Sequence, residues 1–292
     1  MVWQSVVNGL SAGSAYALVA IGFALIFEVS AFYHLSHGAI FTSGAYLSYL
    51  FGIMWGLPTG LAILFAIVGS AILGAGMEYA VYRPMRHKGA TSLVLLIASL
   101  GLLVVIQNVI SLIFGDATKT LQAGPVVEGL DVFGARVTPI QITTIVLSIA
   151  LSGCLWALMR YTKWGKVMRA VAADRELSVI VGARTDQIIL GAFIAGSMLA
   201  GIAGILVGYD MNITPTMGFE AMLMGVVAAI VGGMGSIPGA LLGGWFIGLS
   251  EHLGVLKLPS QWQDTIVFLI LLVFLLLKPE GFLGRPRQKL AD

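Results

Sequence analysis

The chain alternates between long apolar runs and short polar stretches, and several runs reach the roughly 20 residues that cross a bilayer as an α-helix. The runs are continuous, whereas strands of a membrane β-barrel alternate in polarity over roughly 10 residues. We therefore predict an all-α polytopic membrane protein with about eight to nine transmembrane or re-entrant helices in a single domain, 1–292. The expected segments are 5–27, 39–55, 59–82, 92–114, 139–159, 188–209, a glycine-broken stretch at 219–251, and 265–277.

The composition agrees with a lipid environment. Hydrophobic residues make up 58% of the chain and charged residues 10%, with a mean hydropathy of +0.97. A soluble domain carries roughly 25% charged residues, so a water-soluble fold of this length could not hide so much apolar surface. The single cysteine, Cys154, excludes a disulfide framework and a cysteine-based metal site.

Basic residues gather in alternate polar stretches. Residues 83–88, 160–187 and the tail from 278 hold 13 of the 16 lysines and arginines. The positive-inside rule places these stretches in the cytoplasm and the loop at about 115–138 in the periplasm. The side of the N-terminus stays open, because it depends on how residues 28–55 cross the membrane.

Two places interrupt the apolar signal. Residues 28–46 contain Glu28, His34 and His37, and residues 231–244 contain six glycines and Pro238. Broken helices at membrane depth occur only where protein or a water-filled cavity surrounds them, and in transporters they often mark the substrate path. Plain turns at 28–38 and 231–244 are the alternative, and both readings stay open.

The most polar helical segment is "GKVMRAVAADREL", in the middle of the basic stretch 160–187. Apolar side chains recur at three- and four-residue spacing, which predicts one amphipathic helix over 165–182. It could lie on lipid headgroups, serve as a solvated connector, or dock into a groove of a cytoplasmic partner. Asp174 and Glu176 favour docking, because a helix that binds anionic lipid would lack acidic residues.

Several motifs together resemble a known family. "GKVMRAVAADRELSVIVG" matches a coupling-helix pattern, G-x-x-x-R-A-x-x-x-D-x-x-x-A-x-x-x-G, except that Ser178 replaces alanine. "NGLSAGSAYALVAIGFALIF", "TPTMGF", "GGMGSIPGALLGG" and "LLLKPEGFLG" follow the same family in the same order. The family is that of permease subunits of ABC importers for branched-chain amino acids. His34 to Ser36 depart from its Asn-Phe-Ala sequence, which leaves the exact substrate open.

The resemblance implies an inner-membrane permease that carries branched-chain or other hydrophobic amino acids by alternating access. Other amino acids, urea, amides or small aromatic acids stay open as cargo. The implied partners are two ATP-binding cassette subunits, a second permease as heterodimer or homodimer, an extracytoplasmic substrate-binding protein and membrane lipid, without nucleic acid. ATP-Mg would be used by the partners, and this chain would bind no cofactor. The residues implied in ATPase coupling are Gly165, Arg169, Ala170, Asp174, Glu176 and Gly182.

The sequence does not indicate an enzyme. It lacks a P-loop, a zinc-protease motif and a nucleophile elbow, so we expect neither catalytic residues nor a metal site. Glu78 is expected to snorkel or to pair with Arg83. An ion-coupled secondary transporter or channel, with Glu28 and His37 as a relay, is the alternative function. By position, the candidates for the substrate path are Ser14, Tyr16, His37, Gly38, Thr42, Gly232 and Gly235.

Overall fold

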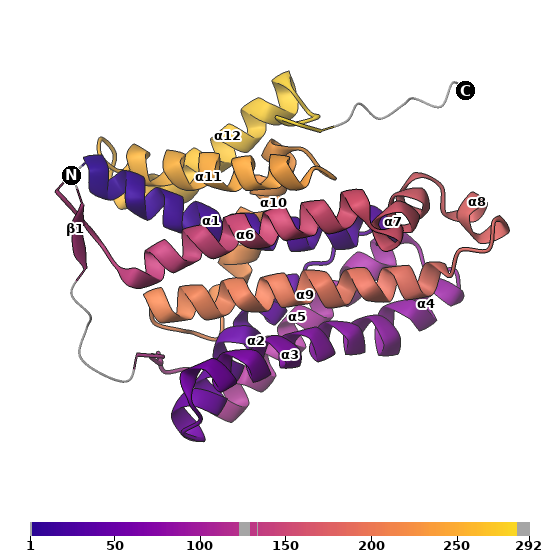
Figure 1. Ribbon diagram of the computed structural model, residues 1–292, viewed down its shortest axis with the longest axis horizontal. Helices are drawn as coiled ribbons and strands as arrows, with labels where there is room; N and C mark the ends of the chain where they lie inside the picture. Colours follow the sequence, from indigo (N-terminus) through magenta and orange to yellow (C-terminus); the bar gives the residue numbers. More distant parts are fainter. Residues whose placement is uncertain (1, 123–128, 133, 285–292) are drawn as a thin grey trace.

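The computed structural model describes residues 2–122, 129–132 and 134–284. It is mostly helical, and its long helices run side by side along the longest axis of the molecule (Figure 1). Six helices within the described residues are long and apolar enough to cross a membrane. They are α1 (Val2–Ser30), the continuous helix Thr59–His87, α5 (Ser92–Phe114), α6 (Pro139–Tyr161), α9 (Thr185–Asp210) and the final helix Ser260–Leu277.

Two of these six spans are composite. Thr59–His87 consists of α3 (Thr59–Met77), the π-helical turn η2 (Glu78–Tyr82) and α4 (Arg83–His87). Ser260–Leu277 consists of the short η3 (Ser260–Trp262) and α12 (Gln263–Leu277). The other elements are α2 (His37–Tyr49), η1 (Leu50–Met54), α7 (Lys163–Ala173), α8 (Arg175–Ile180), α10 (Met217–Gly232), α11 (Ile237–Gly254), β1 (Leu130–Val132) and β2 (Ala135–Val137).

The count of eight to nine membrane elements is not confirmed. The described residues hold six spanning helices, or up to seven if α10 and α11 form one span bent by 119°. The 13 residues of α2 extend only about 20 Å, which is less than the hydrocarbon core of a bilayer. The prediction of an all-α fold also missed a small antiparallel hairpin, β1–β2, in which Leu130 pairs with Val137.

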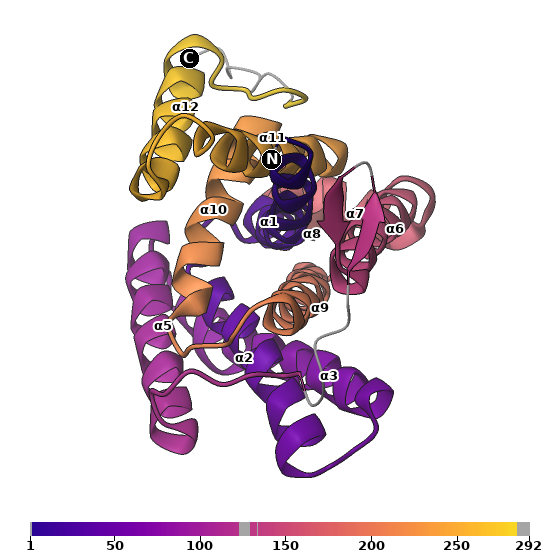
Figure 2. The same ribbon diagram turned by 90° about the vertical axis from the view of Figure 1, so that its left-hand side faces the viewer.

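The core forms around α1. In an apolar stretch of 18 residues of this helix, 78% are buried inside the bundle. Glycines let its neighbours approach closely, as is common in membrane bundles. A Cβ atom added to Gly13 would lie 2.6 Å from the Gly244 carbonyl oxygen of α11. Gly22 and Gly196 make the same kind of contact between α1 and α9. In Figure 2, α9, α10 and α11 surround α1 on three sides and α6 flanks the fourth.

The two ends of the bundle differ in charge. Arg83, Arg86, α7 and α8 lie together at one end, here called the basic end (Figure 1). The start of α1 lies at the opposite end, where Gln4 bonds to the backbone of Arg136 in β2. The positive-inside rule predicts that the basic end faces the cytoplasm and that α1 begins on the other side of the membrane. Of the tail residues used to predict orientation, Arg285, Arg287 and Lys289 lie outside the described residues.

Candidate functional site

The polar segment of the basic end forms α7, which lies beside the end of α6, and α8, which projects beyond the spanning helices in Figure 1. Thr162 begins α7 by accepting a hydrogen bond from the Gly165 backbone N–H at 3.2 Å. Met168 and Val171 are buried on the inner face of α7. The amphipathic pattern therefore places one face of α7 on the bundle and leaves the other open.

The prediction of one continuous helix over 165–182 is wrong. Asp174 ends α7 and begins α8, because its backbone is extended and its Oδ1 accepts a hydrogen bond from the Leu177 N–H at 2.9 Å. An aspartate is a favourable N-cap for this reason. The segment is thus a helix, a kink at Asp174 and a second short helix, and hydrophobic spacing does not detect such a break.

The six predicted coupling residues fall into two groups. Gly165 lies against the Met159 backbone at the end of α6, and Arg169 donates a hydrogen bond to the Met159 carbonyl. Gly182 adopts a φ of 86°, which ends the segment in a turn. With the Asp174 cap, these four residues shape the segment itself. Ala170 and Glu176 are exposed, and no bond within the described part of the chain occupies the Glu176 carboxylate.

Apolar side chains are exposed next to Glu176. Leu177 is 56% exposed, and Val179, Ile180 and Val181 are 55%, 80% and 75% exposed. Such a cluster at the polar end of a membrane protein is typical of a protein–protein contact. We call Ala170, Glu176, Leu177, Val179, Ile180 and Val181 the α7–α8 surface.

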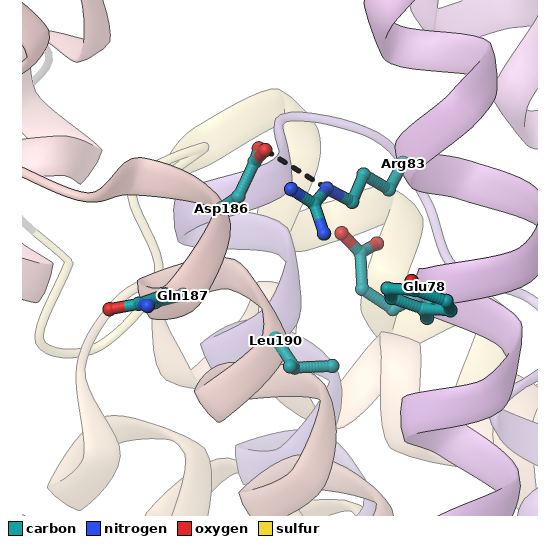
Figure 3. A pocket seen from close by; sticks show the side chains of 6 residues that line it. Glu78, Arg83, Asp186, Gln187 and Leu190 are labelled. Atoms are coloured by element: carbon teal, nitrogen blue, oxygen red, sulfur yellow. Dashed lines mark hydrogen bonds and ion pairs between the residues drawn. The ribbon is translucent and has the colours of Figure 1, made fainter.

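Asp186, in the first turn of α9, lies close to four basic side chains. Its Oδ2 lies 3.0 Å from Arg83 Nε and 2.9 Å from His87 Nε2. Its Oδ1 lies 3.9 Å from Arg86 Nη2 and 3.8 Å from Arg175 Nη2. Figure 3 shows Arg83 and Asp186 facing each other at a cavity of about 220 Å³, with Glu78 beside them. We call these five residues, together with Glu78, the Asp186 cluster.

The predicted pairing of Glu78 with Arg83 is wrong. Glu78 forms a two-pronged ion pair with Arg86, whereas Arg83 pairs with Asp186. The side chains of Glu78 and Arg86 are 1% and 5% exposed, so this pair is almost fully removed from solvent. The π-helical turn η2 shifts the helical register between Glu78 and α4. The spacing of side-chain pairs in a regular α-helix therefore does not predict that Glu78 pairs with Arg86.

The predicted path residues do not share one site. Ser14 is buried and accepts a hydrogen bond from Trp245 Nε1 at 2.9 Å. Tyr16 donates to Glu251 Oε2 at 3.1 Å and lines a cavity of about 310 Å³ near the end of the bundle opposite the basic end. That cavity also contains Asn8, Asp210 and His252, and none of the other predicted path residues lines it.

A second group lies where α2 and α10 begin. Gly38 and Gly218 approach so closely that a Cβ on either would strike the carbonyl of the other. Thr42 Oγ1 accepts a hydrogen bond from the Gly218 N–H at 3.0 Å, and His37 is fully buried against Gly22. The starts of two short helices therefore meet inside the bundle.

Gly232 and Gly235 belong to a third place. Gly232 packs against Gly239, and Gly235, with a φ of 85°, lies next to the Glu28 side chain at the basic end of α1. The sharp bend between α10 and α11 is thus built by glycines at the basic end.

The sequence did not single out Asp186 as a site residue. Its only signal is an acidic residue in the first turn of a spanning helix that follows a basic loop. Acidic residues are common there because they interact favourably with the helix dipole, so the signal is not specific. Three of its four partners come from residues 83–87, about 100 positions away, and only the folded chain brings them to Asp186.

Comparisons with known proteins identify the family. Residues 5–276 match the family described as "Branched-chain amino acid transport system / permease component". The chain is 33% identical to the high-affinity branched-chain amino acid transport system permease protein LivH of Escherichia coli K12, over 97% of this chain and 96% of that protein. It is 32% identical to BraD of Pseudomonas aeruginosa PAO1, a permease protein of the same description, with the same coverage.

A solved structure supports the fold. PsaBC from Streptococcus pneumoniae in complex with Fab is similar with a TM-score of 0.53 at 13% sequence identity, covering 94% of this chain and 91% of that one. The predicted family, inner-membrane location and absence of enzymatic activity of its own are confirmed. The chain belongs to the permease component family of branched-chain amino acid transport systems.

Proposed function

We propose that this permease carries branched-chain or related hydrophobic amino acids inward, driven by ATP hydrolysis in partner subunits. The relatives over nearly the full length of the chain are permeases of branched-chain amino acid transport systems, which supports this substrate class. The observation that carries the mechanism is the α7–α8 surface, because an exposed apolar and acidic patch at the basic end offers a docking site for a cytoplasmic protein.

The α7–α8 surface is the proposed contact with an ATP-binding cassette subunit. Ala170, Glu176 and the apolar residues of α8 would touch that subunit directly. Gly165, Arg169, Asp174 and Gly182 would act indirectly, since their contacts lie within this chain and fix the shape of the segment. This division assigns the implied coupling residues to two different tasks.

Transport would proceed by alternating access in a complex. The proposed assembly contains two ATP-binding cassette subunits that use ATP-Mg, a second permease and an extracytoplasmic binding protein. The meeting point of α2 and α10 at Gly38, Thr42 and Gly218 suits a pathway element, because transporters use the starts of short helices near substrate sites. Ser14, Tyr16, His37, Gly232 and Gly235 remain path candidates, and they would then act at three different depths.

Co-purification tests the docking assignment. The tagged permease is expressed with its ATP-binding subunits, solubilised in mild detergent and compared with Glu176→Lys and Ala170→Glu. Both variants change exposed side chains that make no hydrogen bond or ion pair within the described residues, so they should fold normally. Because both change the α7–α8 surface, they should lose the ATP-binding subunits. Arg169→Glu is less suitable, because it would also break the bond to Met159.

Lys257→Glu, an exposed charge reversal at the opposite end, is the matched control and should retain the ATP-binding subunits. If the unaltered chain binds no ATP-binding subunit, or if both α7–α8 variants bind as well as Lys257→Glu, the docking proposal is wrong. Uptake that a protonophore abolishes while ATP is maintained would point instead to an ion-coupled transporter.

A further inference from the structure

Asp186 lies between two parts of the molecule that otherwise share no ion pair in the described residues. Arg83, Arg86 and His87 come from α4, at the end of the span Thr59–His87. Arg175 comes from α8, directly after the kink at Asp174. One carboxylate on α9 therefore contacts both the proposed docking segment and a membrane-spanning helix.

The contacts continue from Asp186 into the bundle. Arg86 joins Asp186 to Glu78 in the π-helical turn η2. The same turn contains Tyr82, whose hydroxyl lies 2.8 Å from Ser36 Oγ and 3.1 Å from His34 Nδ1. Ser36 and His34 are fully buried in the connection between α1 and α2. Two sets of polar contacts, joined by the backbone of η2, thus lead from α8 to the start of α2.

The balance of charge makes Asp186 important to this arrangement. The cluster contains three guanidinium groups and His87 but only two carboxylates, and Arg86 already holds Glu78. Without the Asp186 charge, Arg83 and Arg175 would have no carboxylate partner among the described residues, while Arg86 would keep Glu78. The Asp186 side chain is 24% exposed and Arg175 is 40% exposed, so this contact can exchange without burying an unpaired charge.

We propose that Asp186 is a positioning residue that links movement of the α7–α8 segment to the span Thr59–His87 and, through Tyr82, to the start of α2. The inference rests on the proposed function. ATP-driven movement of the docked segment would change its contact with Asp186, and a transporter can use only such differences between two states to couple them. Substrate would not touch Asp186, which lies in the first turn of α9 at the basic end.

The test uses the complete importer reconstituted in lipid vesicles, with its binding protein and an equimolar mixture of leucine, isoleucine and valine as the probe. ATP hydrolysis, uptake and subunit stoichiometry are measured for Asp186→Asn, Asp186→Glu and Arg160→Gln. Arg160 is the matched control, because it is an exposed cation at the same end that stacks on Trp156 outside the cluster. The thermal midpoint of each purified complex reports folding.

We expect the Asp186→Asn complex to keep its subunits and its thermal midpoint, and its rate of ATP hydrolysis should stay within about twofold. Uptake per ATP hydrolysed should fall about tenfold, which is a typical size for coupling between two sites. Asp186→Glu should recover at least about half of the lost coupling, because it keeps the charge. Arg160→Gln should match the unaltered complex. This pattern separates a role in coupling from a role in folding.

Three results would overturn the inference: unchanged uptake per ATP in Asp186→Asn, loss of ATP-binding subunits or of thermal stability in that variant, or equal defects in Asp186→Asn and Asp186→Glu. The proposed function fails separately, if the unaltered complex shows no ATP-dependent uptake of the amino acid mixture.

Discussion

The core around α1 and the Asp186 cluster hold the helices together by different interactions. In the core, glycines such as Gly13 and Gly244 bring backbones into direct contact over apolar surfaces. In the cluster, charged side chains from α4, α8 and α9 meet at the basic end, and several remain partly exposed. The first kind of contact tolerates little movement, since backbones cannot rearrange as side chains do.

The difference separates a fixed part of the molecule from an adjustable one. Close backbone packing favours one arrangement of α1, α9 and α11, which suits a scaffold. Exposed ion pairs contribute little to stability and can exchange partners, which suits an element that moves between two states. The buried Glu78–Arg86 pair belongs to the cluster by position but resembles the core in its burial.

The largest effect is expected from Arg86→Ala. It leaves the Glu78 carboxylate buried without its partner, and breaking a buried ion pair in this way lowers the free energy of unfolding by about 3–5 kcal/mol. Unfolding in detergent followed by denaturant or heat measures the change.

The double variant Glu78→Leu with Arg86→Met is the control for that prediction. It removes both charges and keeps similar volumes, so it should recover most of the lost stability. If the double variant is no more stable than Arg86→Ala, side-chain packing rather than the unpaired charge explains the loss.

Gly13→Val tests the rigid core. The new side chain would meet the Gly244 carbonyl of α11, and we expect a loss of about 3 kcal/mol in the free energy of unfolding, as is typical of overpacking. Gly101→Val provides the matched comparison on α5, because a Cβ atom there meets nothing within 4 Å. Equal stability of the two variants would show that the α1–α11 contact is not close packed.

An intermediate effect is expected at the α7–α8 surface, the proposed docking site. Ile180→Asp places a charge in the centre of the exposed apolar residues of α8 and should weaken binding of the ATP-binding subunit by about 2 kcal/mol, or about 30-fold. Titration of the detergent-solubilised permease with the purified subunit measures this. Lys257→Asp, at the other end of the molecule, should bind normally, and a similar loss in both variants would rule out a local effect.

Arg83→Gln is expected to have the smallest effect on stability. Its side chain is 42% exposed, and an exposed ion pair contributes no more than about 1 kcal/mol. The difference from the unaltered protein should shrink further in high salt, which screens exposed charges. Thermal unfolding at low and high salt checks both points, and a loss as large as that of Arg86→Ala would remove the distinction between the two parts of the cluster.

Much of the molecule could be predicted from local properties of the chain. Hydropathy located the long spans, and alternating basic stretches predicted which end faces the cytoplasm, because both depend on residues close together in sequence. The family followed from motifs that are also local. The count of eight to nine spanning elements was not confirmed, because α2, α10 and α11 are too short or too bent for hydropathy alone to classify.

The pairings depended on tertiary structure. Glu78 pairs with Arg86 rather than Arg83, because a π-helical turn changes the direction in which the side chains point. Asp186 meets Arg83 across about 100 residues of chain, and Gly13 meets Gly244 across more than 200. The sequence by itself determined a multi-helix permease of this family and predicted that its basic end faces the cytoplasm. Only the packing of helices decided which charges and glycines touch, because such contacts depend on the relative rotation and tilt of whole helices, which no local pattern specifies.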